Sequence, residues 1–304
     1  MLFCAVLWEA LVQAAHAGPN PKADSRTCSN ASGEVAIAAC NRAIQSRTFR
    51  GRDLAVLYQN RGVEWDAKRD YDRAIADYTE AIKLNPKYAL AYTTRGSAWG
   101  RKRDYDRAIA DFTEAIRLNP KYARAYDNRG RAWRDRGDLD RAIADYTEAI
   151  RLDPKYAHAY NNRGAAWDDK RDYDRAIADY TEAIQLDPKN ATFHNDRCWA
   201  HAIANRDLQQ ALADCDQSLR LRPNHANTLD SRGFVHLRLG RLDDAIADYD
   251  AALKLNPEMA DSLYGRGIAR LRKQDAGGGK ADIAAAIAAQ SDIADRFKRY
   301  GVTP

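Results

Sequence analysis

The chain has 304 residues, of which 45% are hydrophobic and 30% are charged, and its formal net charge is only +5. So small an excess, with both signs interspersed along the chain, argues against a nucleic-acid or membrane-surface partner. The length allows two ordinary domains or one elongated array.

The first predicted element is the apolar segment 1–17, which reads MLFCAVLWEALVQAAHA and ends in a small-x-small cleavage pattern, Ala15-His16-Ala17. This is the outline of a signal peptide, although no basic residue precedes the segment and Glu9 interrupts it. The segment is too short to be a membrane span. We therefore predict a periplasmic or secreted protein without a membrane span, with a cytoplasmic protein as the alternative.

From residue 55 onward the chain repeats itself. Arg-Gly pairs occur at 61–62, 95–96, 129–130, 163–164, 232–233 and 266–267, and Arg197-Cys198 stands in the same register. The step is 34 residues throughout, except for one step of 35 between Arg197 and Arg232. Counting Arg197-Cys198, there are seven such pairs, and a proline follows each of the first six, at positions 86, 120, 154, 188, 223 and 257.

Each repeat unit has the pattern of two antiparallel helices. In residues 55–88 a first helix carries Tyr58, Gly62 and Trp65, and Asp70 is placed to cap a second helix. The apolar residues of that second helix recur at a helical spacing, and Pro86 ends it. A glycine and several alanines allow close helix packing, and one pair buries its apolar face only against the next pair.

The period, with Tyr58, Gly62, Trp65, Ala74, Tyr78, Ala81 and Pro86, resembles the tetratricopeptide repeat. This resemblance covers seven units: 55–88, 89–122, 123–156, 157–190, 191–225, 226–259 and 260–293. It implies an all-α fold, a right-handed α-α superhelical solenoid of stacked helix pairs with first helices on the concave side. Such proteins are mostly adaptors that hold a peptide or a partner helix.

The two ends complete this array. In the leader, residues 18–54, the segment 34–44 resembles the second helix of a degenerate leading unit. At the other end, residues 292–304 place Ile293, Phe297 and Tyr300 on one helical face. We predict that this C-terminal helix caps the open end of the last repeat.

The resemblance also assigns a concave groove to the residues just before each Arg-Gly pair and to their neighbours. Asparagine suits contact with a peptide backbone, because its amide both donates and accepts hydrogen bonds. A merely hydrated wall is the alternative. The lysines of a chaperone-type carboxylate clamp are missing from the accompanying positions. The predicted partner-binding residues are Asn60, Thr94, Asp127, Asn128, Arg131, Asn161, Asn162, Asn195, Asp196, Asp230 and Ser231, with Trp199 and Phe234 in the position of Arg131 in later units.

An arginine and an aspartate recur in all seven units, as in Arg61 and Asp77. Because a guanidinium bonds a carboxylate through two parallel donors, we predict a structural ion pair between helices. A ladder of ligand-binding arginines is the alternative.

Four cysteines remain after the signal segment. Cys198 occupies the glycine position of the fifth unit and Cys215 the aromatic position of its second helix. These facing positions predict a disulfide, which leaves Cys28 to pair with Cys40 in the leader. The alternatives are buried free thiols, or a zinc site of Cys198, His201 and Cys215 that lacks an evident fourth ligand.

No catalytic arrangement, metal site or cofactor motif is predicted. The sequence favours a protein-interaction scaffold that binds a protein or peptide and is not an enzyme. A cell-envelope structural or assembly factor, and an accessory subunit of a separate enzyme, are the alternatives.

Overall fold

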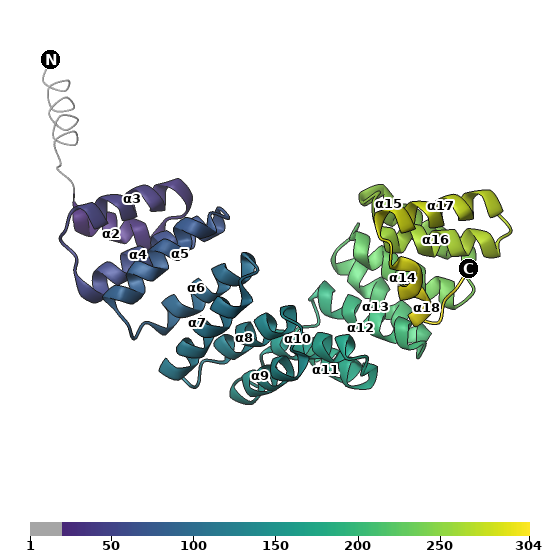
Figure 1. The fold of residues 1–304 in the computed structure, drawn as a ribbon, viewed down its shortest axis with the longest axis horizontal. Helices are drawn as coiled ribbons and strands as arrows, with labels where there is room; N and C mark the ends of the chain where they lie inside the picture. Colours follow the sequence, from purple (N-terminus) through teal and green to yellow (C-terminus); the bar gives the residue numbers. More distant parts are fainter. Residues whose placement is uncertain (1–19) are drawn as a thin grey trace, which may run out of the picture. The chain divides into compact units, whose positions relative to one another are not determined.

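The structure, a computed structural model, describes residues 20–304, so the predicted signal segment 1–17 lies outside it. Within the described residues every regular element is a helix (Figure 1). None of these helices is both long and apolar enough to cross a membrane. The predicted all-α solenoid of stacked helix pairs is confirmed.

The chain divides into two compact units, up to Arg141 and from Ala142 onward. The first unit contains α2 (Pro21–Asn30), α3 (Gly33–Gln45), α4 (Gly51–Ala67), α5 (Tyr71–Leu84), α6 (Ala89–Arg101), α7 (Tyr105–Leu118) and α8 (Ala123–Asp135). The boundary falls near the start of α9 (Leu139–Leu152). The second unit continues with α10 (Ala157–Asp169), α11 (Tyr173–Leu186), α12 (Ala191–Ala204), α13 (Leu208–Leu221), α14 (Ala226–Arg238), α15 (Leu242–Leu255), α16 (Ala260–Arg272), α17 (Ala276–Ala289) and α18 (Ile293–Arg299).

Aspartate side chains cap the N-termini of several second helices. The side chain of Asp70 accepts a hydrogen bond from the backbone N–H of Arg73 at 3.1 Å, which confirms the predicted cap of α5. Asp104 and Asp172 cap α7 and α11 in the same way. Such a cap satisfies a backbone donor that the first helical turn leaves without a partner.

The leader is a helix pair rather than a single helix. α3 covers the segment that resembles a second repeat helix, and α2 packs beside it as the first. The side chain of Asn20 caps α2 and Pro21 stands at its start, both common signals of a helix N-terminus. These signals lie in a polar stretch without an apolar period, so the periodicity does not predict α2.

In the repeats that pair Arg-Gly with an aromatic residue, glycine lets the ring of the second helix lie against the first. A Cβ at Gly62 would stand 2.6 Å from Tyr78 Cε1, and one at Gly164 would stand 2.9 Å from Tyr180 Cε1. Both rings are almost fully buried. The glycine of Arg-Gly is therefore the contact that sets the spacing of the two helices.

Two glycines of α6 provide a matched test of this contact. A Cβ at Gly96 would lie 2.9 Å from Phe112 Cε1 and 3.1 Å from the Ala108 carbonyl oxygen, whereas one at Gly100 meets nothing within 4 Å. We expect Gly96→Ala to lower the free energy of unfolding by about 1–3 kcal/mol through overpacking. Gly100→Ala should raise it by about 0.5–1 kcal/mol, because alanine is the better helix former. Urea unfolding followed by circular dichroism measures both, and equal shifts in one direction would contradict the contact.

The repeated arginine connects three helices. Arg95 donates to both carboxylate oxygens of Asp111, at 2.7 and 2.8 Å, which confirms the predicted ion pair between the two helices of one repeat. Its remaining nitrogen donates to Thr79 Oγ1 on α5, in the preceding repeat, at 3.1 Å. The side chain therefore fixes both the packing inside a repeat and the register to its neighbour. The same paired geometry occurs at Arg61–Asp77, Arg163–Asp179, Arg197–Asp214, Arg232–Asp248 and Arg266–Asp282.

Candidate functional site

The first helices of successive pairs form one continuous face in each unit. α4 contacts α6 and α6 contacts α8 in the first unit, and α12 contacts α14 and α14 contacts α16 in the second. No such contacts join the second helices α5 and α7 in the first unit, or α13 and α15 in the second. A stack that is closer on one side curves toward that side, so the first helices line the inner face of each unit.

The inner face of the first unit contains a pocket of about 250 Å³ between α6 and α8. Gly96, Ser97 and Gly100 line it from α6, and Asn128, Arg131 and Asp135 line it from α8. The small residues on α6 leave the space, because larger side chains at these positions would fill it.

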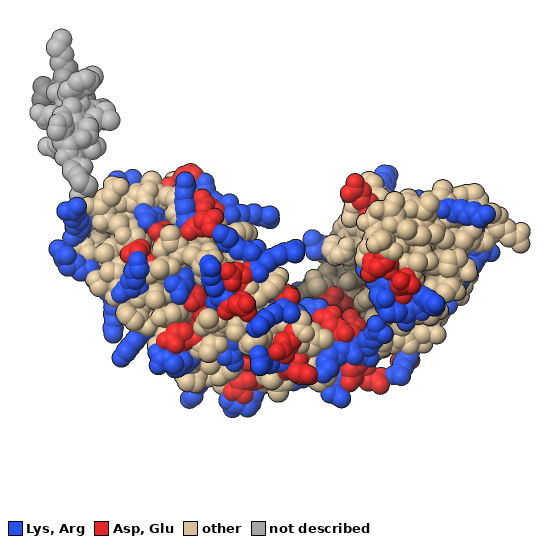
Figure 2. All heavy atoms as spheres, viewed as in Figure 1, with Lys and Arg blue, Asp and Glu red and all other residues tan. Residues whose placement is uncertain are grey.

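The pocket lining is mixed: Tyr105 and Phe112 of α7 are aromatic, and the polar residues include both charges. Arg131 is exposed and donates to Asn128 Oδ1 at 3.2 Å, while Arg101, also in the lining, pairs with Asp66 on α4. Asp135 supplies the opposite charge. Over the face drawn in Figure 2 the two charges are likewise intermingled. The pocket therefore offers an amide and a guanidinium to a ligand, without a broad field of one sign.

The inner face of the second unit is covered by the chain itself. The ring of Phe297 on α18 lies 4.8 Å from Tyr264 and 5.6 Å from Phe234, between ring centroids, and Tyr300 lies 5.6 Å from Trp199. These partners stand on α16, α14 and α12, the first helices of three repeats.

The prediction that residues 292–304 cap the open end of the last repeat is therefore incomplete. α18 contacts α16 and α17, but Phe297 also reaches Phe234 on α14, and Tyr300 reaches Phe234 and Trp199 on α12. The physical reason is the apolar surface of Trp199 and Phe234, on which the aromatic residues of the C-terminus are buried in addition to the last helix pair.

A buried carboxylate lies beside this contact. Asp230 on α14 is 7% exposed and accepts a hydrogen bond from Ser262 Oγ at 2.6 Å. Asp261 lies next to Ser262 and bonds Arg296 of α18 at 2.7 Å. Burial, with a smaller effect of the negative charge of Asp261, raises the pKa of Asp230 to about 7, although Ser262 and Arg296 oppose the rise.

The raised pKa of Asp230 predicts that the free energy of unfolding depends on pH. A folded-state pKa above the ordinary value near 4 means that the folded state binds the proton more tightly than the unfolded state. The stabilisation is then complete below about pH 4 and is lost as the pH rises through about 7. We expect Asp230→Asn, which keeps the acceptor for Ser262, to be more stable than the wild type at pH 8, by less at pH 5, and equally stable at pH 3, measured by urea unfolding. Asp243→Asn, at an exposed carboxylate of the same unit, should show no such pH-dependent difference.

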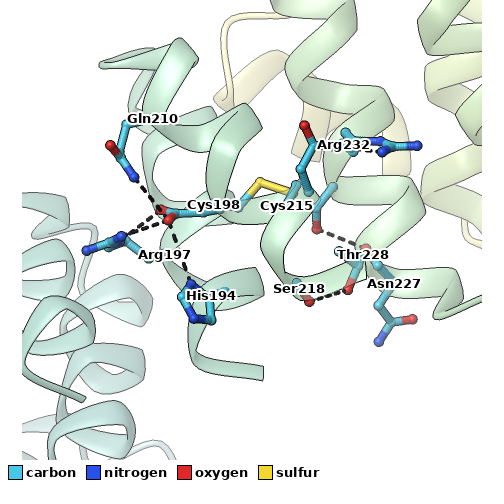
Figure 3. The surroundings of a disulfide bond; sticks show 12 residues. His194, Arg197, Cys198, Gln210, Cys215, Ser218, Asn227, Thr228 and Arg232 are labelled. Atoms are coloured by element: carbon cyan, nitrogen blue, oxygen red, sulfur yellow. Dashed lines mark hydrogen bonds and ion pairs between the residues drawn. A yellow bond between two sulfur atoms is a disulfide. The ribbon is translucent and has the colours of Figure 1, made fainter. Parts of the chain in front are cut away.

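The sulfur atoms of Cys198 and Cys215 lie at bonding distance, 2.00 Å, and join α12 to α13 (Figure 3). Those of Cys28 and Cys40 lie 2.09 Å apart and join α2 to α3. These are the two pairs that the sequence predicts. A zinc site with Cys198 and Cys215 as separate ligands does not fit this arrangement, and no group of three or more His, Cys, Asp or Glu side chains in residues 20–304 is placed to hold a metal.

The extra residue of the fifth repeat is absorbed at the end of α12. This helix ends at Asn205 in a left-handed conformation, with φ of 53°, and Asp207 is also left-handed. Arg197 and Asp214 are therefore 17 positions apart instead of 16, yet they keep the paired geometry of the other repeats, at 2.7 and 2.8 Å (Figure 3).

Four models of one repeat family match the chain. Those described as tetratricopeptide repeat match residues 66–123, 157–190 and 199–264, and one described as TPR repeat matches residues 130–167. The chain is a tetratricopeptide-repeat protein.

Two solved structures agree with this tetratricopeptide-repeat fold, and a third is similar over a smaller part of the chain. The APC/C hetero-tetramer Cut9–Hcn1 has a TM-score of 0.67 at 17% identity, over 87% of this chain and 52% of that one. A tetratricopeptide repeat protein from Parabacteroides merdae ATCC 43184 has a TM-score of 0.63 at 16% identity, over 82% of this chain and 99% of that one. YrrB, described as a TPR protein with an unusual peptide-binding site, has a TM-score of 0.48 at 25% identity, over 62% and 97%. No curated protein matched the chain.

Among the partner-binding residues predicted for this tetratricopeptide-repeat chain, four are buried. Asp127, Asn161, Asp230 and Ser231 are between 4 and 8% exposed. Each precedes an Arg-Gly pair by one or two positions, and there the first helix packs against the next first helix. A buried side chain does not reach a partner on the folded surface, so we correct the prediction for these four.

Several residues of the predicted set, the buried Asn161 among them, connect neighbouring repeats. Asn60 donates to Ser29 Oγ at 3.1 Å, Thr94 accepts from Gln59 at 3.1 Å, and Asn161 donates to Asp196 at 3.0 Å. In each case the partner is on the first helix of an adjacent pair. Asn162 and Asn195 are half-buried, and neither lines the pocket.

Asn128 and Arg131 are the predicted residues that line the pocket. The sequence-based prediction missed Gly100 and Asp135, which stand one helical turn beyond the Arg-Gly register. A signal for Gly100 is present in the sequence. The equivalent residue is charged in the next two repeats, Arg134 and Asp168, so the glycine is an exception at this position. It also missed that Trp199 and Phe234 are covered by the C-terminus.

Proposed function

We propose that the chain is a protein-interaction scaffold, organised as seven repeats over residues 55–293, and that its first unit binds a peptide on the inner face. The tetratricopeptide-repeat fold supports the scaffold. The pocket between α6 and α8 carries the assignment of the site, because it is an open hollow with an amide and an exposed guanidinium.

The chemistry of the pocket indicates the ligand. Asn128 suits a peptide backbone, since its amide both donates and accepts. Arg131 suits a carboxylate, with which it forms two parallel hydrogen bonds. We therefore propose a peptide segment that places an acidic group beside Arg131 and a small side chain near Gly100.

The test uses a random peptide library panned against the full chain, followed by anisotropy measurements on the enriched peptides. Gly100→Leu fills the pocket at a position where an added Cβ meets nothing within 4 Å, and it should weaken binding at least tenfold. Gly100→Ala is the matched control and should retain binding. Arg131→Glu should also weaken binding, whereas Arg117→Glu, an equal change of charge on the second helix α7, should not. Peptides that bind all these variants equally would place the site elsewhere.

We also propose that the protein works in an oxidising compartment, the periplasm or the exterior. The support is the arrangement of four cysteines in two pairs at bonding distance. Disulfides persist in such compartments and are rare in the cytosol. Mass spectrometry of the protein from its native cells, alkylated before and after reduction, tests this. Four thiols that react without reduction would favour the cytoplasm.

A further inference from the structure

The C-terminal segment, residues 291–304, lies on the second unit as a ligand would lie on a receptor. Ile293 is fully buried, Phe297 is 1% exposed and Val302 is 4% exposed. Its helix α18 has only seven residues. Its contacts extend over the aromatic face, which we define as Trp199, Phe234 and Tyr264 on α12, α14 and α16.

Polar contacts fix the position of the segment. Arg296 bonds both carboxylate oxygens of Asp261 at 2.7 Å. In the opposite direction, Arg238 of α14 donates to the backbone oxygen of Tyr300, and Arg272 of α16 donates to that of Thr303 at 3.1 Å. The receptor side therefore binds backbone as well as side chains, which is how a groove holds a peptide.

The receptor residues depart from the repeat at two positions. Tyr264 stands two positions before Arg266, where the preceding repeats have polar residues such as Asn195 and Asp230. The other position follows Arg-Gly. The residue after Arg-Gly, or its equivalent, is Val63, Ser97, Arg131 and Ala165 in the first four repeats and Trp199, Phe234 and Ile268 in the last three. Ring contacts of the C-terminal segment fall on Trp199 and Phe234. Large aromatic side chains at this position are thus confined to the part of the array that holds the segment.

Two polar atoms at this contact lack a partner. Arg238 Nε and Arg296 Nε are buried without a hydrogen-bond partner. Burial lowers the pKa of Arg238 and raises that of Asp261. An unsatisfied buried polar group is unfavourable, so part of the apolar gain of the segment is offset. Terminal segments open at lower cost than packed interior elements, and α18 is a terminal helix of seven residues.

We propose that the aromatic face is a second interaction surface, that its ligand is an amphipathic helix of a partner protein, and that the C-terminal segment occupies it in the absence of that partner. The sequence of the segment indicates the chemistry that the ligand needs. It has an arginine directly followed by an aromatic residue, with a second aromatic residue three positions later. The arginine meets Asp261, and the two rings meet Tyr264, Phe234 and Trp199. This surface is separate from the pocket of the first unit, and the proposal does not depend on that pocket.

The test uses the full chain with the variant Phe297→Ala/Tyr300→Ala, which removes the two rings from the segment. A fluorescent peptide of residues 290–304 serves as the probe, measured by anisotropy. We expect the peptide to bind the variant at least tenfold more tightly than the wild type, in which the face is occupied. A peptide with the same two alanines should bind neither protein, and adding Trp199→Ala to the variant should abolish binding. Gly100→Leu should leave this binding unchanged, which separates it from the function proposed for the first unit.

A variant that remains helical and binds the peptide no better than the wild type would overturn the proposal and assign a fixed capping role to the segment. If the variant unfolds, amide hydrogen exchange of the wild type decides: residues 293–302 should exchange at least tenfold faster than α16. Equal exchange rates would overturn the proposal. A concentration-dependent wild-type dimer that the peptide dissociates would assign the face to a second copy of this chain and overturn the external helix.

Discussion

Replacing Arg95 by methionine should lower the free energy of unfolding by about 3 kcal/mol, the largest effect that we expect of a single substitution. The change leaves Asp111, 6% exposed, without the guanidinium that bonds both its oxygens. Burial already raises the pKa of Asp111 despite Arg95, because the cost of removing the carboxylate from water exceeds the gain from the pair. We take the low end of the range for broken buried pairs, since the Arg95 side chain is 20% exposed.

The double variant Arg95→Met/Asp111→Leu separates a buried charge from a lost contact. With both partners apolar no charge remains uncompensated, so most of the loss should be recovered. Arg117→Met, which breaks an exposed pair with Glu114, should leave the urea midpoint unchanged within error. A double variant as unstable as Arg95→Met would show instead that the bond from Arg95 to Thr79, and not the charge, holds the repeats in register.

Removing the bond between Cys198 and Cys215 should cost about 3 kcal/mol, because the bond closes a short loop and so restricts the unfolded chain. We expect Cys198→Ala/Cys215→Ala to show this loss in urea unfolding, and the wild type to show it in dithiothreitol.

The other repeats supply the matched control. Where the fifth repeat has the two cysteines, the sixth has Gly233 against Tyr249, whose ring is fully buried. Cys198→Gly/Cys215→Tyr restores that packing and should recover at least half of the loss, with no response to reductant. A wild type that is insensitive to dithiothreitol and reacts fully with alkylating agents would show that the thiols are free.

The repeat made most of the fold predictable. Gly62, Ala74 and Tyr78 recur because every pair must fit its neighbours, so one unit read correctly predicts the others. The same periodicity missed α2, whose signals are the cap Asn20 and Pro21 rather than an apolar stripe. It placed the one-residue insertion only between Arg197 and Arg232, and the structure places it at the left-handed Asn205 and Asp207.

The sequence was a poorer guide to which predicted binding residues reach the surface, for a geometric reason. Asp127 and Asn128 are adjacent in sequence, yet the first is buried and the second lines a pocket. A helix turns by about 100° for each residue, so neighbours face different directions. A row of polar residues therefore identifies a helix but does not state which of its members reaches the surface.

The sequence by itself determined the repeat unit, the ion pairs and the pairing of Cys198 with Cys215, because these depend on residues at a fixed spacing within one helix pair. Only the tertiary structure decided where the C-terminal segment lies. Phe297 and Tyr300 have large aromatic rings that any large hydrophobic surface accommodates. The hydrophobic effect is non-directional, so the sequence does not identify the surface on which these rings are buried. The surface that holds them is assembled from Trp199, Phe234 and Tyr264, on three helices from three repeats, and it exists only when those repeats are stacked.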